Sequence, residues 1–253
     1  MAVKIVLTNQ KGGVGKTTTS ATLAAGLGAK GKRVLAIDLD PQGNLGFSLG
    51  LEDEVEHTIY EVLCGKADIR EAICHAEHCD VIPSDVTLSE AEIRLQQDER
   101  QTLLKRALKT VEQNYDFIII DTPPTLNILT LNGYTASDYL IVPMTTEILS
   151  LVGMMQLQET VAAVKETVNP GLDVMGILLT RYNKRTRLAA DVLEMASSVA
   201  AHSNTRLFDA KIRSGVAVAE APAHGMDLLS YAPRSNPAKD YMEFIDEVLE
   251  RIG

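Results

Sequence analysis

Residues 11–18 read Lys-Gly-Gly-Val-Gly-Lys-Thr-Thr, a spacing of lysines, glycines and hydroxyls that suits phosphate binding. The apolar run before them, residues 3–7, predicts a buried strand, and the small residues at 17–27 predict a helix packed closely on a sheet. Glycines let the backbone turn so that several N–H groups face one anion, and the helix dipole adds positive potential there. In such a loop Lys16 reaches the outer phosphates of a nucleotide and the Thr17 hydroxyl ligates Mg²⁺. The octet therefore predicts a phosphate site for a magnesium nucleotide.

The spacing of this loop departs from the common P-loop, G-x-x-x-x-G-K-[ST], which would place its first glycine at position 10. That position holds Gln10, while a second lysine, Lys11, opens the loop. The arrangement resembles the deviant Walker A family. We expect the whole loop to hold the nucleotide, and its members are Lys11, Gly12, Gly13, Val14, Gly15, Lys16, Thr17 and Thr18.

Aspartates end two of the apolar runs that predict strands. Residues 33–38 end at Asp38, and Asp40 follows in a loop that proline and glycine interrupt. Residues 115–121 end at Asp121, and their continuous β-branched character predicts burial on both faces, as in a parallel sheet. Ligands of open α/β sheets bind at the carboxyl ends of the strands, so these carboxylates should meet the phosphate loop. An apolar strand ending in aspartate is the Walker B arrangement, which positions Mg²⁺; the plain alternative for Asp38 and Asp40 is a pair of strand-end caps.

Strands and helices alternate along the chain, which predicts parallel strands joined by helical crossovers. The expected fold class is α/β: a single P-loop NTPase domain over residues 1–253, with a twisted, mostly parallel sheet and helices on both faces. The expected strands are residues 1–8, 33–38, 79–83, 115–121, 138–142 and 172–179. The expected helices are residues 16–30, 57–63, 87–95, 99–113, 125–136, 149–168, 186–203 and 237–252, and residues 205–222 show no clear pattern.

Composition and charge limit the classes of function. Apolar residues make up 45% of the 253 residues and charged residues 23%, as in an ordinary soluble protein. No apolar run approaches the roughly 18 residues that suggest a membrane span, and no signal peptide precedes the first strand, so we expect a cytoplasmic protein with no membrane partner. The net charge of −10 argues against nucleic acid. Basic residues nevertheless outnumber acidic ones at 181–213, where a polyanion could bind locally; the alternative is a solvated helix face.

The cysteines do not form a disulfide framework, because there are three of them: Cys64, Cys74 and Cys79. Two stand beside histidines in the run Cys74, His75, His78 and Cys79, whose side chains are potential zinc ligands. Residues 80–82 already predict a strand, which favours scattered reduced side chains. Both interpretations stay open on the sequence.

Two further motifs make the chain similar to the ParA/Soj-type partition ATPases. They are residues 38–44, Asp-Leu-Asp-Pro-Gln-Gly-Asn, and residues 120–124, Ile-Asp-Thr-Pro-Pro. The resemblance covers essentially the whole chain and is closest to the short ParA proteins, which lack an N-terminal helix-turn-helix domain. These proteins belong to the deviant Walker A family together with MinD and the nitrogenase iron protein.

The resemblance implies a magnesium-dependent ATPase in which two copies sandwich two ATP molecules. Lys11 would cross to the partner's nucleotide and neutralise charge as the phosphoryl group leaves, as an arginine finger does elsewhere. Asp40 would orient the attacking water, with Asp38 near the metal. The implied catalytic residues are Lys11, Lys16, Asp38 and Asp40; the implied metal-site residues are Thr17, Asp38 and Asp121, the last through water. The base is expected near residues 180–183 and just before Glu220, with Asn183 as its contact.

The resemblance also implies non-specific binding of duplex DNA by the ATP-bound dimer, through basic side chains on phosphates. The expected contacts are Lys184, Arg185, Arg187 and Arg213. The chain departs from the family at Ala217, where a basic residue is usual, so the patch depends on its other members. DNA would be the track on which a chromosome or plasmid is positioned, which implies a nucleoid-associated protein and a ParB-like or cargo-adaptor partner that stimulates hydrolysis.

Three alternatives share the ATPase residues. A McdA-like protein would position another cargo, such as a carboxysome, on the nucleoid. A MinD-like protein would end in a basic amphipathic helix, but residues 236–253 carry more acidic than basic residues, so we expect this helix to pack on the domain. A protein like the nitrogenase iron protein needs later cysteines for its cluster, and the sequence has none after Cys79.

Overall fold

Within the described residues, eight strands form one sheet in the order β3-β4-β2-β5-β1-β6-β7-β8. The computed structural model describes residues 1–51, 55–95, 100–145, 149–183, 187–202 and 205–253. Every neighbouring pair is parallel except β3 and β4, which are antiparallel. The predicted α/β fold with a mostly parallel sheet is confirmed. The strands are β1 Val3–Leu7, β2 Val34–Asp38, β3 Cys74–His75, β4 Asp80–Ile82, β5 Phe117–Asp121, β6 Tyr139–Thr145, β7 Asp173–Tyr182 and β8 Leu207–Arg213.

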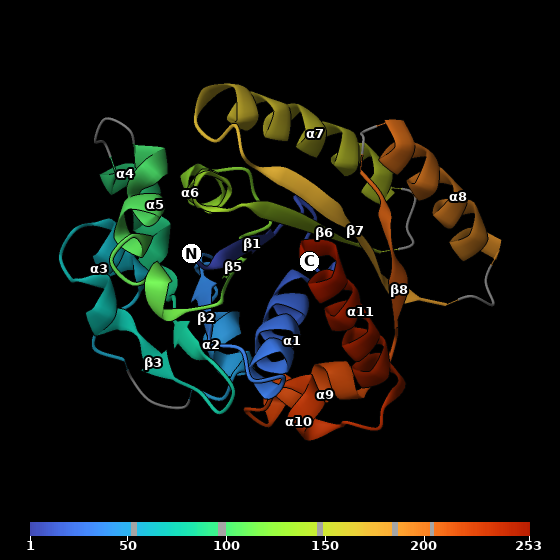
Figure 1. The fold of residues 1–253 in the computed structure, drawn as a ribbon, viewed down its shortest axis with the longest axis horizontal. Coiled ribbons are helices and arrows are strands. Elements are labelled where there is room, and N and C mark those ends of the chain that lie inside the picture. The colour runs from blue at the N-terminus through green and yellow to red at the C-terminus, as the bar shows by residue number, and fades with distance from the viewer. Residues whose placement is uncertain (52–54, 96–99, 146–148, 184–186, 203–204) are drawn as a thin grey trace.

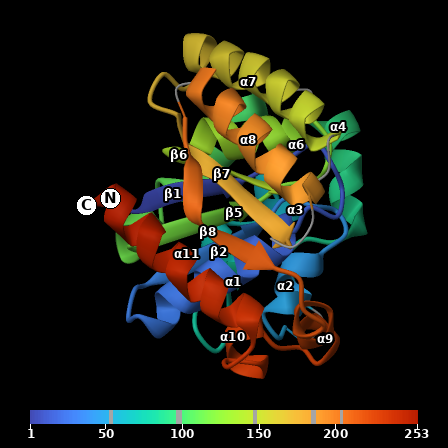
Figure 2. The same ribbon diagram turned by 90° about the vertical axis from the view of Figure 1, so that its right-hand side faces the viewer.

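Helices cover both faces of the sheet (Figure 1). On one face α1 and α11 pack with α2 and α10, and on the other lie α3 to α8. Figure 2 shows α7 and α8 on one side of β7 and β8, with α11 on the other. In the described part of the chain, no helix combines the length and apolar character needed to span a bilayer. The α-helices are α1 Lys16–Ala29, α2 Asn44–Ser48, α3 Ile59–Leu63, α4 Ala91–Arg94, α5 Leu103–Leu108, α6 Ile128–Ala136, α7 Leu149–Thr167, α8 Arg187–His202, α9 Ala217–Ala223, α10 Leu228–Tyr231 and α11 Asn236–Ile252.

The strand β1 shows why the sheet needs both layers. Successive side chains of a strand point to opposite faces. Val6 therefore joins the core under α3 to α8, whereas Ile5 and Leu7 join the core under α1 and α11. All three are fully buried. The continuous apolar runs of the sequence thus mark strands that are covered on both sides.

Residues 205–222 hold two elements that the sequence analysis did not predict, β8 and α9. Along β8 the apolar side chains of Phe208, Ala210 and Ile212 are buried and alternate with more exposed polar ones. This alternation is typical of an edge strand, and it was present in the sequence. The edge is covered by α11, whose Glu247 carboxylate accepts the backbone N–H groups of Asp209 at 2.9 Å and Ala210 at 3.1 Å.

Other stretches also differ from their predicted form. The expected helix at residues 87–95 is a 3₁₀ helix, η2 Val86–Glu90, followed by α4. Residues 99–113 do not form one helix: the described part divides into the 3₁₀ turn η3 Arg100–Thr102, α5, and the 3₁₀ turn η4 Glu112–Asn114. The cysteine–histidine stretch is a hairpin of β3 and β4. His75 Nδ1 lies 2.5 Å from Asp80 Oδ1, and His78 Nε2 lies 3.3 Å from Ser230 Oγ. Among the described residues no group of three or more potential ligands gathers, which favours scattered reduced side chains.

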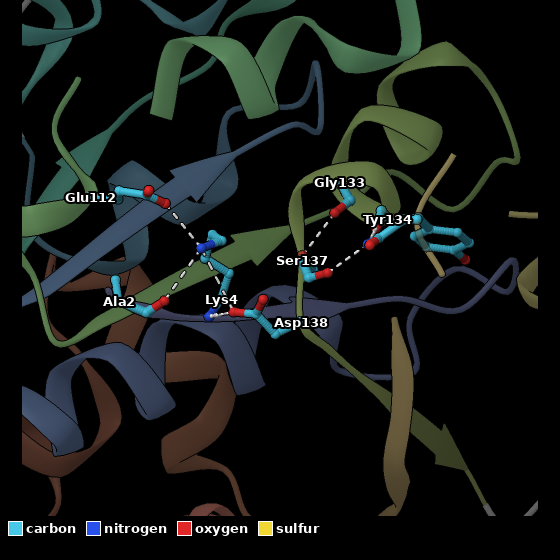
Figure 3. Close-up of polar contacts among 8 residues, drawn as sticks. Ala2, Lys4, Glu112, Gly133, Tyr134, Ser137 and Asp138 are labelled. Atoms are coloured by element: carbon cyan, nitrogen blue, oxygen red, sulfur yellow. Dashed lines mark hydrogen bonds and ion pairs between the residues drawn. The ribbon is translucent and has the colours of Figure 1, made fainter. Parts of the chain in front are cut away.

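Polar contacts join the amino end of β1 to Asp138, just before β6, and to Glu112 of η4, away from the phosphate loop (Figure 3). The Lys4 backbone N–H donates to Asp138 Oδ2 at 2.8 Å, and Lys4 Nζ donates to Glu112 Oε2 at 3.0 Å. Ser137 Oγ donates to the Gly133 carbonyl at 2.7 Å, closing the end of α6. These contacts satisfy polar groups near the core and so fix the position of β1, from which the phosphate loop departs.

Helix α1 packs so closely on the β3–β4 hairpin that one glycine is required. A Cβ atom at Gly28 would lie 1.7 Å from the carbonyl oxygen of His78. We expect Gly28→Ala to lower the free energy of unfolding by about 1–3 kcal/mol, because the helix or the hairpin must shift. Gly171→Ala is the matched control, since its Cβ would meet only Asn169 Oδ1 at 3.8 Å. Urea unfolding of both variants checks this, and equal midpoints would contradict it.

Candidate functional site

The phosphate loop joins β1 to α1 at the carboxyl end of the sheet. Gly13 and Gly15 have φ values of 72° and 86°, in the left-handed region that other residues rarely adopt. Gly15 is the N-cap of α1, and its carbonyl accepts both the backbone N–H and the hydroxyl of Thr19, at 2.9 and 2.6 Å. The loop therefore has the strand–turn–helix geometry that binds phosphate.

Lys16 is held inside this loop. It is 6% exposed, and its Nζ donates to the carbonyl of Lys11 at 3.3 Å. Burial lowers the pKa of Lys16, while the carboxylates of Asp121 and Asp40 oppose this shift. The two lysines of the phosphate loop are thus in contact, through the Lys16 side chain and the Lys11 backbone carbonyl. Lys16 is buried near carboxylates, and Lys11 is half-buried at the start of the loop.

Asp38 and Asp121 lie side by side at the ends of β2 and β5, where they are register partners. Both are completely buried. Asp121 accepts the Thr17 hydroxyl at 2.6 Å and the Ser20 hydroxyl at 2.9 Å. Asp38 accepts backbone N–H groups from Asp40 at 2.8 Å and from Leu45 at 2.9 Å. The structure therefore brings together all three residues predicted for the metal.

Burial raises the pKa of both Asp38 and Asp121, and the charge of Asp121 raises that of Asp38 further. Two buried carboxylates side by side are costly unless a cation neutralises them. Their oxygens, with the Thr17 hydroxyl, are hard donors of the kind that Mg²⁺ takes. The donor set and its electrostatics fit a magnesium ion.

Asp40 lies at the start of the loop that follows β2. Its Oδ1 accepts the backbone N–H of Gln42 at 3.0 Å, and the side chain is only partly buried. Gly43 ends the turn with a φ of 66°, and a Cβ there would lie 2.8 Å from the Ser84 carbonyl. The loop is thus fixed at both ends, with the Asp40 carboxylate close enough to Lys16 to affect its pKa.

A cavity of about 470 Å³ opens beside the phosphate loop. The loop contributes Val14, Gly15 and Thr18; the rest of the wall is Thr180, Arg181, Ile212, Arg213, Ser214, Gly215, Val218, Ala219 and Tyr241. This wall includes part of both segments from which base contacts were expected, residues 180–183 and the stretch before Glu220. Asn183, however, is exposed and does not line the cavity. Arg181 does line the cavity. Its backbone φ is 50°, and among the described residues no other residue except glycine has a positive φ.

Two cavity residues hold the phosphate loop in place. Thr180 Oγ1 donates to the Val14 carbonyl at 2.8 Å. Tyr241 Oη lies 3.0 Å from Thr19 Oγ1; because the Thr19 hydroxyl already donates to Gly15, the tyrosine must be the donor. The sequence analysis did not single out Tyr241, and nothing in its local pattern separates it from the other buried residues of α11.

The residues predicted to bind DNA are only partly described. Lys184 and Arg185 lie outside the described residues, and Arg187 begins α8. Arg213 is described: its Nε donates to Asp240 Oδ2 at 2.8 Å, its backbone N–H donates to the same oxygen at 2.9 Å, and its side chain is 47% exposed. The guanidinium therefore already has a carboxylate partner, and it borders the nucleotide cavity.

Similarity to known proteins agrees with this geometry. The AAA domain family (AAA_31) matches residues 2–174. The chain is 44% identical over 248 residues to the sporulation initiation inhibitor protein Soj of Bacillus subtilis, which covers 96% of this chain and 97% of that protein. It is 40% identical over 253 residues to the chromosome partitioning protein ParA of Caulobacter vibrioides, which covers 98% of this chain and 94% of that protein.

Solved structures share the same architecture. A Mycobacterium smegmatis protein described as cobyrinic acid a,c-diamide synthase, with bound ATP analog and magnesium, has a TM-score of 0.87 and 35% identity over 100% of this chain and 96% of that one. Apo McdA of Cyanothece has a TM-score of 0.86 and 26% identity over the whole of both chains. The near full-length relatives and the phosphate loop with its paired aspartates lead to one assignment: the chain belongs to the ParA/Soj-type P-loop ATPases.

Proposed function

We propose that this chain is a partition ATPase that dimerises around ATP and Mg²⁺, binds duplex DNA non-specifically, and positions a chromosome or plasmid. The observation that carries the proposal is the cluster of Lys16, Thr17, Asp38 and Asp121 at one sheet edge, in a chain similar over nearly its full length to Soj and ParA. On this proposal the protein is cytoplasmic and nucleoid-associated, and a ParB-like or cargo-adaptor protein stimulates hydrolysis.

Each site residue then has a defined task. The backbone of residues 12–18 and the Lys16 ammonium bind the phosphates. Thr17, Asp121 and Asp38 would hold Mg²⁺ or its waters, and the metal when bound neutralises charge on the phosphate oxygens. Asp40 orients the attacking water, and Lys11 reaches the nucleotide of the partner subunit. The wall formed by Thr180, Arg181 and the β8–α9 segment receives the base; Asn183, which follows the end of β7, is the proposed contact to the edge of the base.

The DNA track is the part of the proposal with the most direct test. We expect the protein to bind duplex DNA of unrelated sequences with ATP and not with ADP, and the affinity to fall steeply with salt because phosphate contacts release counterions. Arg185→Glu should abolish this binding while sparing ATP-dependent dimerisation. Fluorescence anisotropy of labelled duplexes at several salt concentrations measures the first effect, and light scattering measures the second.

Lys32→Glu is the matched control, because it makes the same charge change on an exposed lysine at the opposite end of the sheet, between α1 and β2. It should leave DNA affinity nearly unchanged. Equal losses from both substitutions would mean that net charge alone governs binding. A wild-type protein that dimerises with ATP and ignores duplex DNA at low salt would exclude the DNA track.

The second candidate function is positioning of a different cargo, such as a carboxysome, on the same track. The similarity to McdA of Cyanothece favours keeping it. The ATPase residues are common to both candidates, so the stimulating partner must separate them. Hydrolysis measured with a centromere-binding protein and with a carboxysome adaptor distinguishes the two, because only the true partner should increase turnover.

A membrane-surface role of the MinD kind has less support. The apolar stripe of α11 is buried against β8 and α1, with Phe244, Ile245 and Val248 fully buried. The expected packing of this helix on the domain is confirmed. Vesicle co-sedimentation in the presence of ATP would reverse this conclusion if the protein pelleted.

A further inference from the structure

Asn9 lies between the end of β1 and the first lysine of the phosphate loop, and both ends of its side-chain amide are used. It is 6% exposed. Its Nδ2 donates to the Pro143 carbonyl at 2.8 Å, and its Oδ1 accepts the backbone N–H of Lys11 at 2.9 Å. A single buried side chain therefore links the loop to the neighbouring strand β6.

The Asn9 side chain replaces a backbone hydrogen bond between β1 and β6 at the point where the chain leaves the sheet. The pairing of β1 with β6 ends with the Thr8 N–H donating to the Ile141 carbonyl at 3.1 Å. If the parallel pairing continued, the next donor would be the backbone N–H of Gln10, two residues after Thr8, and its acceptor would be the carbonyl of Pro143. The chain turns away there, and Asn9 Nδ2 takes the acceptor instead. Because Pro143 has no N–H, no donor is left unpaired on that side.

The orientation of the Asn9 amide follows from its partners. A backbone N–H only donates and a carbonyl only accepts, so the reversed amide would face donor to donor and acceptor to acceptor. The Lys11 backbone is thereby held on both sides of its Cα: its N–H donates to Asn9, and its carbonyl accepts from Lys16 Nζ at 3.3 Å. Two fixed points, one on each peptide group that flanks the Lys11 Cα, set the direction in which the Lys11 side chain leaves the loop.

We propose that Asn9 is a positioning residue for Lys11: by bridging β6 and the Lys11 peptide, it aims the Lys11 ammonium at the nucleotide of the partner subunit. This rests on the proposed function, in which Lys11 acts across the dimer. Asn9 itself touches no reacting atom. Its loss should therefore weaken dimerisation and turnover much more than nucleotide binding by the single subunit.

The test measures two quantities for Asn9→Ala, Lys11→Ala and the double variant. Light scattering with a non-hydrolysable ATP analogue and Mg²⁺ gives the dimer dissociation constant, and a fluorescent ADP gives the affinity of the monomer. We expect Asn9→Ala to raise the dimer constant about tenfold or more while monomer affinity changes by less than about threefold. The double variant should be no worse than Lys11→Ala, because Asn9 acts only through that lysine.

Asn169→Ala is the matched control. Asn169 is 8% exposed and its Nδ2 donates to the carbonyls of Tyr134 at 2.8 Å and Ser137 at 2.7 Å, at the other end of the sheet. It should lower the melting temperature and leave the dimer constant unchanged. Asn9→Ser, whose hydroxyl can still accept the Lys11 N–H, should retain part of the dimerisation and provides a folded variant if the alanine does not fold.

The outcomes distinguish failure of the proposed function from failure of the positioning role of Asn9. If Lys11→Ala dimerises normally, the proposed function fails. If Lys11→Ala is defective and Asn9→Ala behaves like Asn169→Ala, the positioning role fails alone. A double variant clearly worse than Lys11→Ala would also overturn it, because Asn9 would then act elsewhere.

Discussion

Asp40→Ala is expected to lower ATP turnover about a hundredfold or more and to accumulate the ATP-bound dimer on DNA. The Asp40 carboxylate lies near Lys16 at the phosphate loop, and it is only partly buried. On the proposed function, this carboxylate orients water toward the phosphate and plays no part in holding the nucleotide. Phosphate release, light scattering and DNA anisotropy with ATP measure the three effects, and we expect the first to fall while the other two rise.

The fold should tolerate this change, which keeps the result interpretable. The Asp40 carboxylate accepts a hydrogen bond from the Gln42 N–H at 3.0 Å, a contact within its own loop. Asp68→Ala is the matched control, because Asp68, the N-cap of η1 Ile69–Ala72, accepts the Arg70 N–H at 2.9 Å in the same local pattern. Asp68→Ala should hydrolyse ATP normally. Unchanged turnover in Asp40→Ala would remove Asp40 from its assigned role.

The sequence was sufficient for those parts of the site that follow from strand ends. An apolar run ending in aspartate places its carboxylate at the carboxyl edge of a parallel sheet, whatever the strand order. The sequence alone therefore predicts that Asp38 and Asp121 lie near the phosphate loop at Gly13 and Gly15. Their pairing in register requires that β2 and β5 be neighbours in the sheet. No local sequence pattern predicts that neighbourhood.

Contacts between segments far apart in the chain could not be predicted from the sequence. Asn9 meets Pro143, Thr180 meets Val14, and Tyr241 meets Thr19, and each depends on which strand or helix becomes the neighbour. Ser20 was missed for a different reason. It stands one helical turn after Lys16, so its hydroxyl reaches Asp121 beside that of Thr17, a spacing that the small-residue character of α1 concealed.

The predicted helix over residues 99–113 shows the limit of periodicity. Leu104 and Leu108, which stand one helical turn apart in the sequence, are buried on the same side of the segment. The segment nevertheless breaks, because the Leu104 N–H is taken by Asn132 Oδ1 of α6 at 3.0 Å and not by a preceding carbonyl. Periodicity thus identified the face that packs, and a tertiary hydrogen bond decided where the helix begins.

Lys11→Ala should strongly weaken ATP-dependent dimerisation and reduce hydrolysis by about a thousandfold or more, as loss of an arginine finger does elsewhere. Nucleotide affinity of the single subunit should change little, because on the proposed function Lys16 and the loop amides hold the phosphates. Lys16→Ala should do the opposite and abolish nucleotide binding, since it removes the buried cation beside Asp121 and Asp40. Binding of a fluorescent ATP analogue to dilute protein, with light scattering and phosphate release, separates the two lysines.

Mixing variants tests whether Lys11 acts on the partner's nucleotide. In a heterodimer of Lys11→Ala and Asp40→Ala subunits, the site of the first subunit has its own Asp40 and receives Lys11 from the second, so one complete site forms. The other site lacks both groups. Two inactive proteins should therefore regain hydrolysis when mixed at concentrations that favour dimers, in proportion to the heterodimer formed. If Lys11 served the nucleotide of its own subunit, neither site would be complete, and the mixture would stay as inactive as its components.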